Sequence, residues 1–322
     1  MDRKVDDNLK KKICITGGAG FIGTHLAGRL IKDNIVFLFD NYRRDSLTGL
    51  EIENHPNCTI INGDITNKQE VSKAIQGVDI VIHLAAIAGV SSYYSIPYDT
   101  LQVNIGGTIN VLDAVVESDV KKLIYFSSSE VYGQIAKNVK EEDILSIGPV
   151  SDKRWVYATS KLAGENLVLR CGEKHNFHAT CIRPFNIYGP RQTGEGAISN
   201  FFNAACKKEP LQVYGDGEAI RAWCYISDLV DSIELILCND ISRGHTFNIG
   251  NDSAIESSNS LAKKIALLYS NIDIYHKSID RTEVIIRIPN INKARSLLGF
   301  SPKVTMDEGL NFTSHWFWSQ YL

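Results

Sequence analysis

The sequence lacks both a marked excess of charge of one sign and any long apolar run. Its 322 residues include 34 lysines and arginines and 37 aspartates and glutamates, which gives a formal net charge of −3. A chain this close to balance has no electrostatic footprint for nucleic acid or for an anionic membrane surface. No apolar run approaches the roughly 18 residues that a membrane-spanning helix needs. We therefore expect neither a nucleic-acid-binding protein nor a membrane protein.

Cysteine is scarce and scattered. The 7 cysteines are odd in number and form no CxxC pair, which argues against a disulfide framework and against a zinc site. His175 and His178 are close in sequence but no third ligand accompanies them, so we expect no metal site. The segment 1–12 lacks the apolar stretch and the small-residue cleavage site of a signal peptide. These absences favour reduced thiols and a cytoplasmic protein.

The first half of the chain alternates short apolar runs with helical patterns. This alternation predicts the α/β class, with a doubly wound parallel sheet that is covered on both faces. The apolar runs are continuous, as expected for strands buried on both sides. The predicted strands are residues 13–16, 36–39, 58–62, 79–84, 122–127 and 178–183, and the predicted helices are residues 21–32, 68–76, 97–117 and 157–171.

The rhythm changes after residue 183, where glycine, proline and short mixed segments become frequent. We expect residues 1–183 to form a first domain, to which residues 225–250 return. Residues 184–224 and 251–322 then form a smaller, less regular α/β lobe, with a cleft between the two parts. The elements predicted in this half are helices at 198–208, 229–237, 259–269, 292–298 and 306–320 and strands at 213–214 and 246–249.

A glycine-rich turn follows the first strand and opens the first helix. Gly17, Gly20 and Gly23 permit a tight turn, a close approach of a pyrophosphate, and close packing of helix on strand. The helix N-terminus, which contains Phe21 and Ile22, presents free N–H groups to the phosphates. Because strand and helix flank the turn as required, we predict a dinucleotide-binding domain.

Asp40 ends the second strand, where a carboxylate can accept hydrogen bonds from the adenosine ribose diol. A 2′-phosphate would meet the negative charge of Asp40, so we predict NAD as the cofactor. Asn41 follows Asp40 and is expected to border the cofactor too. Arg43 and Arg44 lie just beyond and could hold a 2′-phosphate, which leaves NADP open.

Tyr157 and Lys161 are four residues apart at the start of a predicted helix and so share one face. A lysine ammonium beside a phenol favours the phenolate and is expected to lower the tyrosine pKa from its free value of about 10. Such a phenolate can take a proton from a sugar hydroxyl while a hydride leaves the carbon. The hydroxyl-rich run that ends in Ser128, Ser129 and Glu130 completes a candidate catalytic set.

With these motifs the chain resembles the extended short-chain dehydrogenases/reductases of the nucleotide-sugar epimerase/dehydratase family, over nearly its whole length. The resemblance implies a Rossmann-type first domain, bound NAD and a nucleotide-sugar substrate, for which we favour a UDP-linked sugar. The supporting motifs are residues 17–23, Gly63-Asp64-Ile65, His83-Leu84-Ala85-Ala86, Asn104, residues 127–133, Tyr157 with Lys161, Arg183-Pro184-Phe185-Asn186, Arg221, and Lys293-Ala294-Arg295 with Leu298-Gly299-Phe300.

The resemblance also implies roles for individual residues. Asp64 and Ile65 would border the adenine. Ser128 would bond the reacting hydroxyl. The residues implied to line the cofactor channel are Leu84, Ala85 and Ala86, and those implied to bind the substrate are Asn186, Arg191, Arg221 and Arg281, of which Asn186, Arg221 and Arg281 would contact the diphosphate. Arginines are credible ligands for such an anion.

The reaction is less constrained by the sequence. Members of the family first oxidise a sugar hydroxyl, usually at C4, and a typical 4,6-dehydratase then uses an Asp-Glu pair where this chain has Ser129 and Glu130. We interpret Glu130 as a general base near C5, in a dehydratase or epimerase of a UDP-hexose, with a UDP-N-acetylhexosamine favoured.

Three alternatives stay open. The Ser-Glu pair is similar to that of the UDP-glucuronate decarboxylases, although only Arg154 and Arg191 suggest themselves as partners for a uronate carboxylate. A plain 4-epimerase needs no extra acid or base. A non-catalytic dinucleotide sensor is disfavoured because such proteins tend to lose the tyrosine and lysine.

The resemblance also implies an oligomeric state. Members of the family form dimers through a four-helix bundle, and the apolar positions at 103–116 and 162–169 predict a homodimer.

Overall fold

The computed structural model describes residues 10–270 and 272–321. Its largest sheet has seven strands in the order β12-β7-β5-β4-β1-β2-β3, and every neighbouring pair is parallel. The strands are β1 (Lys12–Thr16), β2 (Ile35–Asp40), β3 (Cys58–Asn62), β4 (Ile80–His83), β5 (Lys122–Phe126), β7 (His178–Pro184) and β12 (Thr246–Ile249). The central strands β4 and β5 are buried along their whole length, whereas β3 at the edge is partly exposed.

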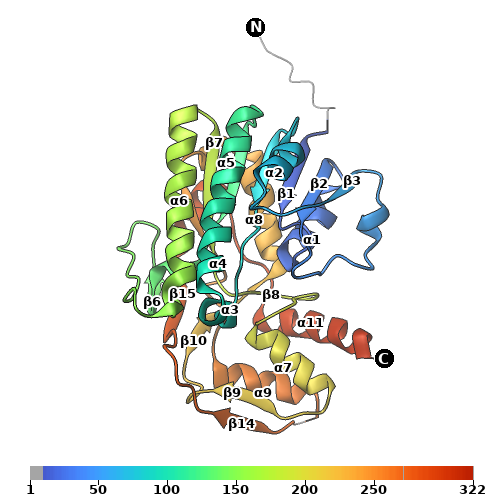
Figure 1. Cartoon of the computed structure of the whole chain (residues 1–322). Coiled ribbons are helices and arrows are strands. Elements are labelled where there is room, and N and C mark those ends of the chain that lie inside the picture. The colour runs from blue at the N-terminus through green and yellow to red at the C-terminus, as the bar shows by residue number, and fades with distance from the viewer. Residues whose placement is uncertain (1–9, 271, 322) are drawn as a thin grey trace.

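Helices cover both faces of this sheet (Figure 1). One face packs against α1 (Phe21–Leu30), α8 (Ile226–Cys238) and α10 (Asn292–Leu298). The other packs against α2 (Lys68–Ile75), α5 (Gly107–Glu117) and α6 (Val156–His175). The predicted α/β class and doubly wound parallel sheet are confirmed.

A second lobe lies below the sheet in the view of Figure 1. Its apolar core contains residues of α7 (Ala197–Cys206), α9 (Ser258–Leu268) and α11 (Met306–Tyr321). The strands β9 (Leu211–Tyr214) and β14 (Ile274–Lys277) pair in parallel beside these helices. Two further short strands, β8 (Ile187–Tyr188) and β11 (Cys224–Tyr225), also pair with one another.

A four-stranded sheet next to the foot of α6 combines distant parts of the chain (Figure 1). Its order is β13 (Ile255–Ser257), β10 (Ile220–Ala222), β15 (Ile286–Pro289) and β6 (Ile135–Val139). None of these strands was expected from the sequence, because each is short, mixed in composition and stabilised by pairing with a segment far away in the chain.

The predicted helix at 97–117 is interrupted. It consists of α4 (Pro97–Leu101), a π-helical turn (Gln102–Gly106) and α5. The side chain of Asn104 in this turn bonds the backbone N–H and carbonyl of Ile87 and the hydroxyl of Ser160. Such π turns often occur at functional sites. The remaining short elements are α3 (Val90–Ser95) and the 3₁₀ turns Glu51–Asn54, Ser129–Tyr132, Lys153–Trp155 and Asp240–Ser242.

The carboxyl ends of the parallel strands meet at one edge of the sheet, where open α/β sheets bind ligands. The glycine turn follows β1, Asp40 ends β2, and the candidate catalytic segment 127–130 follows β5. The strand order reverses at β1, which lies between β2 and β4. Within residues 10–270 and 272–321, no helix is both long and apolar enough to cross a membrane.

Candidate active site

The glycine turn packs so closely against the neighbouring backbone that it leaves no room for a side chain at Gly17 or Gly23. Gly17 adopts a φ of +73°, and a Cβ on it would lie 2.7 Å from the backbone nitrogen of Ala85. A Cβ on Gly23 would lie 2.5 Å from the carbonyl oxygen of Gly17. Gly20 is the N-cap of α1 and places no side chain over the helix end, while Phe21 and Ile22 pack against the apolar core. The free N–H groups of this helix start therefore suit a dinucleotide pyrophosphate.

A cleft extends from this turn across the edge of the sheet. Its lining includes most of the residues that the sequence assigned to the cofactor. These are Gly17, Asp40, Asn41, Arg43, Ile65, Leu84, Ala85 and Ala86, joined by Phe39, Arg44, Gly63, Ile87, Ala88 and Val103. Asp64 lies beside the cleft, where its carboxylate accepts hydrogen bonds from Asn41 and from Thr66.

Asp40 is held in place by the backbone. Its Oδ2 accepts the N–H of Ala19 at 3.0 Å and its Oδ1 accepts the N–H of Tyr42 at 2.8 Å. Burial raises the pKa of Asp40, and these backbone bonds oppose the rise. Each carboxylate oxygen keeps a second lone pair for a ribose hydroxyl, so the site fits the adenosine ribose of NAD.

The two arginines after Asp40 line the cleft and contact protein groups from the segment that follows β4. Arg43 Nη2 lies 3.4 Å from the hydroxyl of Ser92, and Arg44 Nη2 donates to the carbonyl of Ala88 at 2.8 Å. The guanidinium of Arg44 passes close to Gly89 and Gly194, where a Cβ would come within 2.6 and 2.8 Å of it. Both arginines are therefore engaged with protein groups near the entrance of the cleft.

Tyr157 and Lys161 lie together in the first two turns of α6, both buried. Lys161 Nζ donates to the carbonyl of Phe126 at 2.7 Å and lies 5.7 Å from the centre of the Tyr157 ring. The Tyr157 ring stacks on Tyr93 with 5.0 Å between ring centres. The candidate catalytic pair is thus fixed from three elements, namely α6, β5 and α3.

The expected lowering of the Tyr157 pKa is not what the structure gives. Burial and the nearby charge of Glu130 raise the pKa of Tyr157, while a hydrogen bond with Ser128 opposes them. Burial also lowers the pKa of Lys161 to about 7. A lysine that loses its proton before the phenol does cannot stabilise the phenolate, so the pair needs a further positive charge or a way to keep Lys161 protonated.

The segment after β5 forms a 3₁₀ turn. Ser128 is its N-cap, and its Oγ accepts the N–H of Glu130 at 3.1 Å. Ser129 is buried in the same turn. The turn therefore fixes the direction in which Glu130 points.

Glu130 lies between two buried arginines. Arg154 Nη2 is 2.6 Å from Glu130 Oε2, and Arg287 Nη1 donates to Glu130 Oε1. Burial alone would raise the pKa of Glu130, but the two guanidinium groups outweigh it and lower the pKa. The carboxylate is therefore held in its ionised form, which makes it a weak base.

Positive charge exceeds negative charge around Glu130. Arg287 is 2% exposed and Arg154 is 4% exposed. Among the described residues, Arg154 Nη1 and Arg287 Nε have no hydrogen-bond partner. Arg221 lies near enough that burial and the charge of Arg287 lower its pKa to about 10. Buried donors without a partner next to the candidate catalytic tyrosine fit a ligand that carries its own negative charge.

The sequence missed Arg287. Its one local signal is a lone arginine inside the apolar run that forms β15. The pairing of β15 with β6 places Arg287 opposite Ala136, shortly after the turn that holds Glu130. That proximity depends on long-range strand pairing, which no local pattern reveals.

Of the four residues proposed for substrate binding, Asn186 and Arg221 lie together, whereas Arg191 and Arg281 contact other parts of the structure. Arg221 donates to the carbonyls of Ile220 and Val284. Asn186 has a φ of +40° and donates to the carbonyl of Ala222 at 2.8 Å, so these two lie on neighbouring backbone. The guanidinium of Arg281 lies 5.6 Å from the centre of the Tyr214 ring. The backbone carbonyl of Arg191 accepts a hydrogen bond from the hydroxyl of Ser46 at 2.9 Å, beside the glycine turn and Asp40.

Comparison with known proteins gives consistent matches. The model of the family described as NAD dependent epimerase/dehydratase matches residues 13–250. A UDP-N-acetyl-alpha-D-glucosaminuronate decarboxylase from Bacillus cytotoxicus is 34% identical, and the alignment covers 96% of this chain and 98% of that protein. UDP-glucuronic acid decarboxylase 1 from Xenopus tropicalis is 33% identical over 96% of this chain and 72% of its own length.

A solved structure agrees with these matches. The crystal structure of a UDP-glucuronic acid 4-epimerase from Bacillus cereus, in complex with UDP-glucuronic acid and NAD, superimposes with a TM-score of 0.87. It is 28% identical, and the match covers 96% of this chain and 100% of that chain. The resemblance deduced from the motifs therefore extends to the whole fold.

Proposed function

The chain belongs to the NAD-dependent epimerase/dehydratase family, and from that premise we propose that it is a UDP-glycuronate decarboxylase. The family and its NAD cofactor are as the sequence predicted. The order of the specific hypotheses changes, however. Decarboxylation, an alternative at the sequence level, becomes the main proposal, and dehydration or epimerisation with Glu130 as a base becomes second.

The observation that carries the proposal is the pairing of Glu130 with Arg154 and Arg287. Two guanidinium groups face one carboxylate, and two of their nitrogen atoms lack a partner among the described residues. A substrate carboxylate would supply the missing negative charge and acceptors. A neutral hexose would leave the buried donors unpaired, at a cost of about 1–3 kcal/mol each.

The chemistry of a glycuronate suits a weakly basic Glu130. Bound NAD would accept a hydride from C4 and later return it. Tyr157 takes the proton of the C4 hydroxyl, which Ser128 orients. The resulting ketone stands β to the C6 carboxylate, so the C5–C6 bond breaks with loss of carbon dioxide and its electrons move toward the C4 oxygen. The enolate that results takes one proton from solvent at C5, which restores the C4 ketone before the hydride returns. No base has to remove a proton from C5, whereas a dehydratase requires one.

The relatives narrow the choice of substrate. The first substrate to test is UDP-N-acetylglucosaminuronate, because a decarboxylase described for that compound aligns with nearly the whole chain. UDP-glucuronate is the second, since the Xenopus relative is described for it. UDP-N-acetylglucosamine, favoured by the sequence, becomes the neutral comparison.

The test is the incubation of the purified protein and NAD with each of the three UDP-sugars in deuterated water. We expect loss of carbon dioxide and one deuterium at C5 with a glycuronate, seen by mass spectrometry and proton NMR. Tyr157→Phe serves as an inactive variant, which we expect to retain NAD binding. Unchanged mass with a new sugar spectrum would support a 4-epimerase, and loss of water from the neutral sugar would restore the dehydratase.

We also propose that the enzyme is a homodimer. The helices α5 and α6 run side by side (Figure 1), and a groove between them is lined by Ile109, Leu112, Ala163 and Leu167 among others. Ile109 exposes 42% of its surface in this groove, and Val116, also on α5, exposes 37%. Apolar side chains in such a groove favour association with a second copy of the same face.

A further inference from the structure

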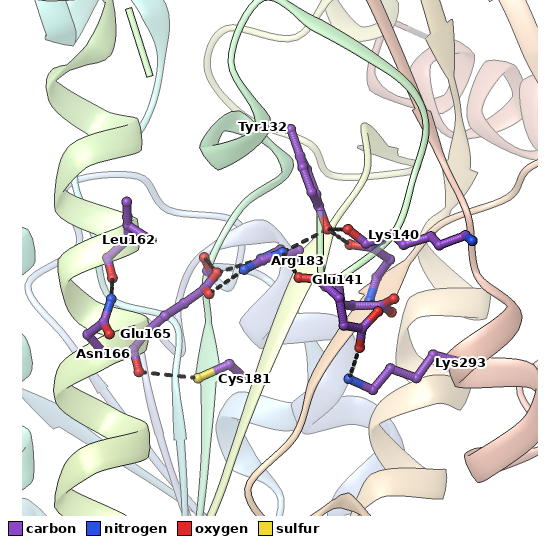
Figure 2. Close-up of polar contacts among 12 residues, drawn as sticks. Tyr132, Lys140, Glu141, Leu162, Glu165, Asn166, Cys181, Arg183 and Lys293 are labelled. Carbon is purple, nitrogen blue, oxygen red and sulfur yellow. Dashed lines mark hydrogen bonds and ion pairs between the residues drawn. The ribbon is translucent and has the colours of Figure 1, made fainter. Parts of the chain in front are cut away.

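A buried ion pair between Glu165 and Arg183 joins α6, the helix of Tyr157 and Lys161, to β7. Glu165 follows Lys161 by one turn of α6 and is 4% exposed, as is its partner Arg183 on β7. Arg183 Nε donates to Glu165 Oε1 and Arg183 Nη2 donates to Glu165 Oε2, each at 2.8 Å. Figure 2 shows this two-point contact between α6 and the neighbouring strand. The hydroxyl of Ser127 donates to the same carboxylate.

Arg183 continues the network toward the catalytic turn. Its Nη1 donates to the hydroxyl of Tyr132 at 2.7 Å, and its guanidinium lies 4.9 Å from the centre of that ring. The Tyr132 hydroxyl lies within hydrogen-bond distance of Asn248 Oδ1 and of the carbonyl of Lys140. Figure 2 shows Arg183 between Glu165 on one side and Tyr132 on the other. Tyr132 ends the turn that begins with Ser129.

The network therefore joins both halves of the catalytic set. Glu165 shares α6 with Tyr157 and Lys161, and Ser127 immediately precedes Ser128 at the end of β5. A buried ion pair is not required for stability, because apolar residues of similar volume often do as well. The position of this pair, one helical turn from the catalytic lysine, suggests an additional role.

We propose that Glu165 is a positioning residue of the reaction, which acts through Lys161 by keeping its amine protonated and through Ser127 by fixing the catalytic turn. Arg183 aligns the Glu165 carboxylate through its two hydrogen bonds. The part of this inference that concerns turnover rests on the proposed function. The part that concerns the protonation of Lys161 does not.

The surroundings of Lys161 leave Glu165 as its source of negative charge. The side chains that face its amine are Tyr157 on the same helix, Tyr125 on β5 and His83 on β4. Burial lowers the pKa of His83 to about 3 and raises the pKa of both tyrosines, so all three are neutral near pH 7. Among the described groups that shift the pKa of Lys161, Glu165 alone raises it.

The experiment replaces Glu165 by glutamine, which keeps the shape and removes the charge. Lysine labelled with carbon-13 at Cε reports each amine by NMR, and the signal of Lys161 is the one lost in Lys161→Arg. We expect the midpoint of its titration to move to lower pH in Glu165→Gln. This measurement needs no sugar substrate, so it is independent of whether the enzyme is a decarboxylase.

The second readout is turnover of the substrate identified above. We expect kcat of Glu165→Gln at neutral pH to fall about tenfold, as for a tenfold loss of protonated lysine, with KM unchanged and the alkaline limb of the pH profile at lower pH. Glu165→Asp keeps the charge, so its Lys161 titration midpoint should lie close to the wild-type value. Glu173→Gln, an exposed change on the same helix, should alter neither quantity.

The outcomes separate the possibilities. An unchanged Lys161 midpoint in Glu165→Gln overturns the inference whatever the substrate is. A changed midpoint with full turnover also overturns it, because Glu165 would then not serve the reaction. If Glu165→Gln does not fold, the double variant Glu165→Met/Arg183→Met replaces it, because apolar side chains of similar volume can substitute for a buried ion pair, and a Lys161 midpoint equal to that of the wild type would then overturn the inference.

Discussion

Arg287 and Glu130 are 157 positions apart in the sequence and form an ion pair in the structure. The contact follows from strand pairing, since β15 runs beside β6 and β6 begins shortly after the turn that holds Glu130. Arg287 Nη2 is also fixed by the carbonyl of Gly133 at 2.6 Å. The smaller sheet thus delivers a buried positive charge to the catalytic edge of the larger one.

Replacement of Arg287 by methionine should impair decarboxylation selectively. The substitution removes a charge-assisted hydrogen bond worth about 2 kcal/mol, so kcat/KM for the glycuronate should fall about thirtyfold or more. Steady-state kinetics on the glycuronate measures the effect, and NAD binding should be unchanged. Arg287→Lys keeps the charge but loses the two-nitrogen geometry of the guanidinium. Its kcat/KM should therefore lie between those of Arg287→Met and the wild type. Full activity of Arg287→Met would contradict a role for this side chain in carboxylate binding.

Glu130→Gln tests the charge balance through stability. The pKa of Glu130 is lowered in the folded protein, so its carboxylate stabilises the fold above its ordinary pKa, and this contribution is lost as the pH falls through the folded value. At neutral pH the variant leaves two buried arginines without their counterion, so we expect a loss on the order of 3 kcal/mol.

The measurement is urea unfolding of both proteins at neutral pH and at a series of lower pH values that extends below the ordinary glutamate pKa of about 4.3. The difference between wild type and Glu130→Gln should be large at neutral pH and should shrink in acid. Glu173→Gln, whose glutamate is exposed, is the control and should differ little from wild type at any of these pH values. A difference that does not depend on pH would show that Glu130 is not held ionised.

Much of the fold was predictable because it depends on local signals. Continuous apolar runs located the strands of the parallel sheet, and the glycine turn located the cofactor end of the cleft. The environment of Glu130 was not predictable, because Arg287 reaches it through the pairing of two strands whose sequences carry little strand signal. The sequence-based role of Glu130 as a base depended on its position in a motif, whereas its basicity depends on neighbours that only the folded chain supplies.

The pKa of Tyr157 shows the same limit. Spacing along α6 correctly put Lys161 on the face of Tyr157, but it gave no information on burial. Burial acts on both groups, and it moves the two pKa values in opposite directions.

The choice between NAD and NADP depends on Asp40. Its carboxylate would repel a 2′-phosphate, so Asp40→Asn should improve NADP binding relative to NAD by on the order of tenfold, which is about 1.4 kcal/mol. Asparagine keeps one oxygen to accept a backbone N–H, which limits damage to the turn. Titration calorimetry with both dinucleotides measures the ratio, with the exposed Asp33→Asn as control. An unchanged ratio would indicate that Arg43 or Arg44 determines the preference.

Association through α5 and α6 can be tested with one charge. Ile109 lies in the groove between these helices and is 42% exposed. In a symmetric dimer, Ile109→Asp places two carboxylates in the apolar interface, and we expect the dissociation constant to rise at least about a hundredfold, or about 2.8 kcal/mol. Sedimentation velocity over a range of concentrations should show a dimer for the wild type and a monomer for the variant. Val150→Asp, a change at a fully exposed valine elsewhere, should remain dimeric. A wild-type protein that sediments as a monomer would refute the dimer, and a dimeric Ile109→Asp would place the interface on another surface.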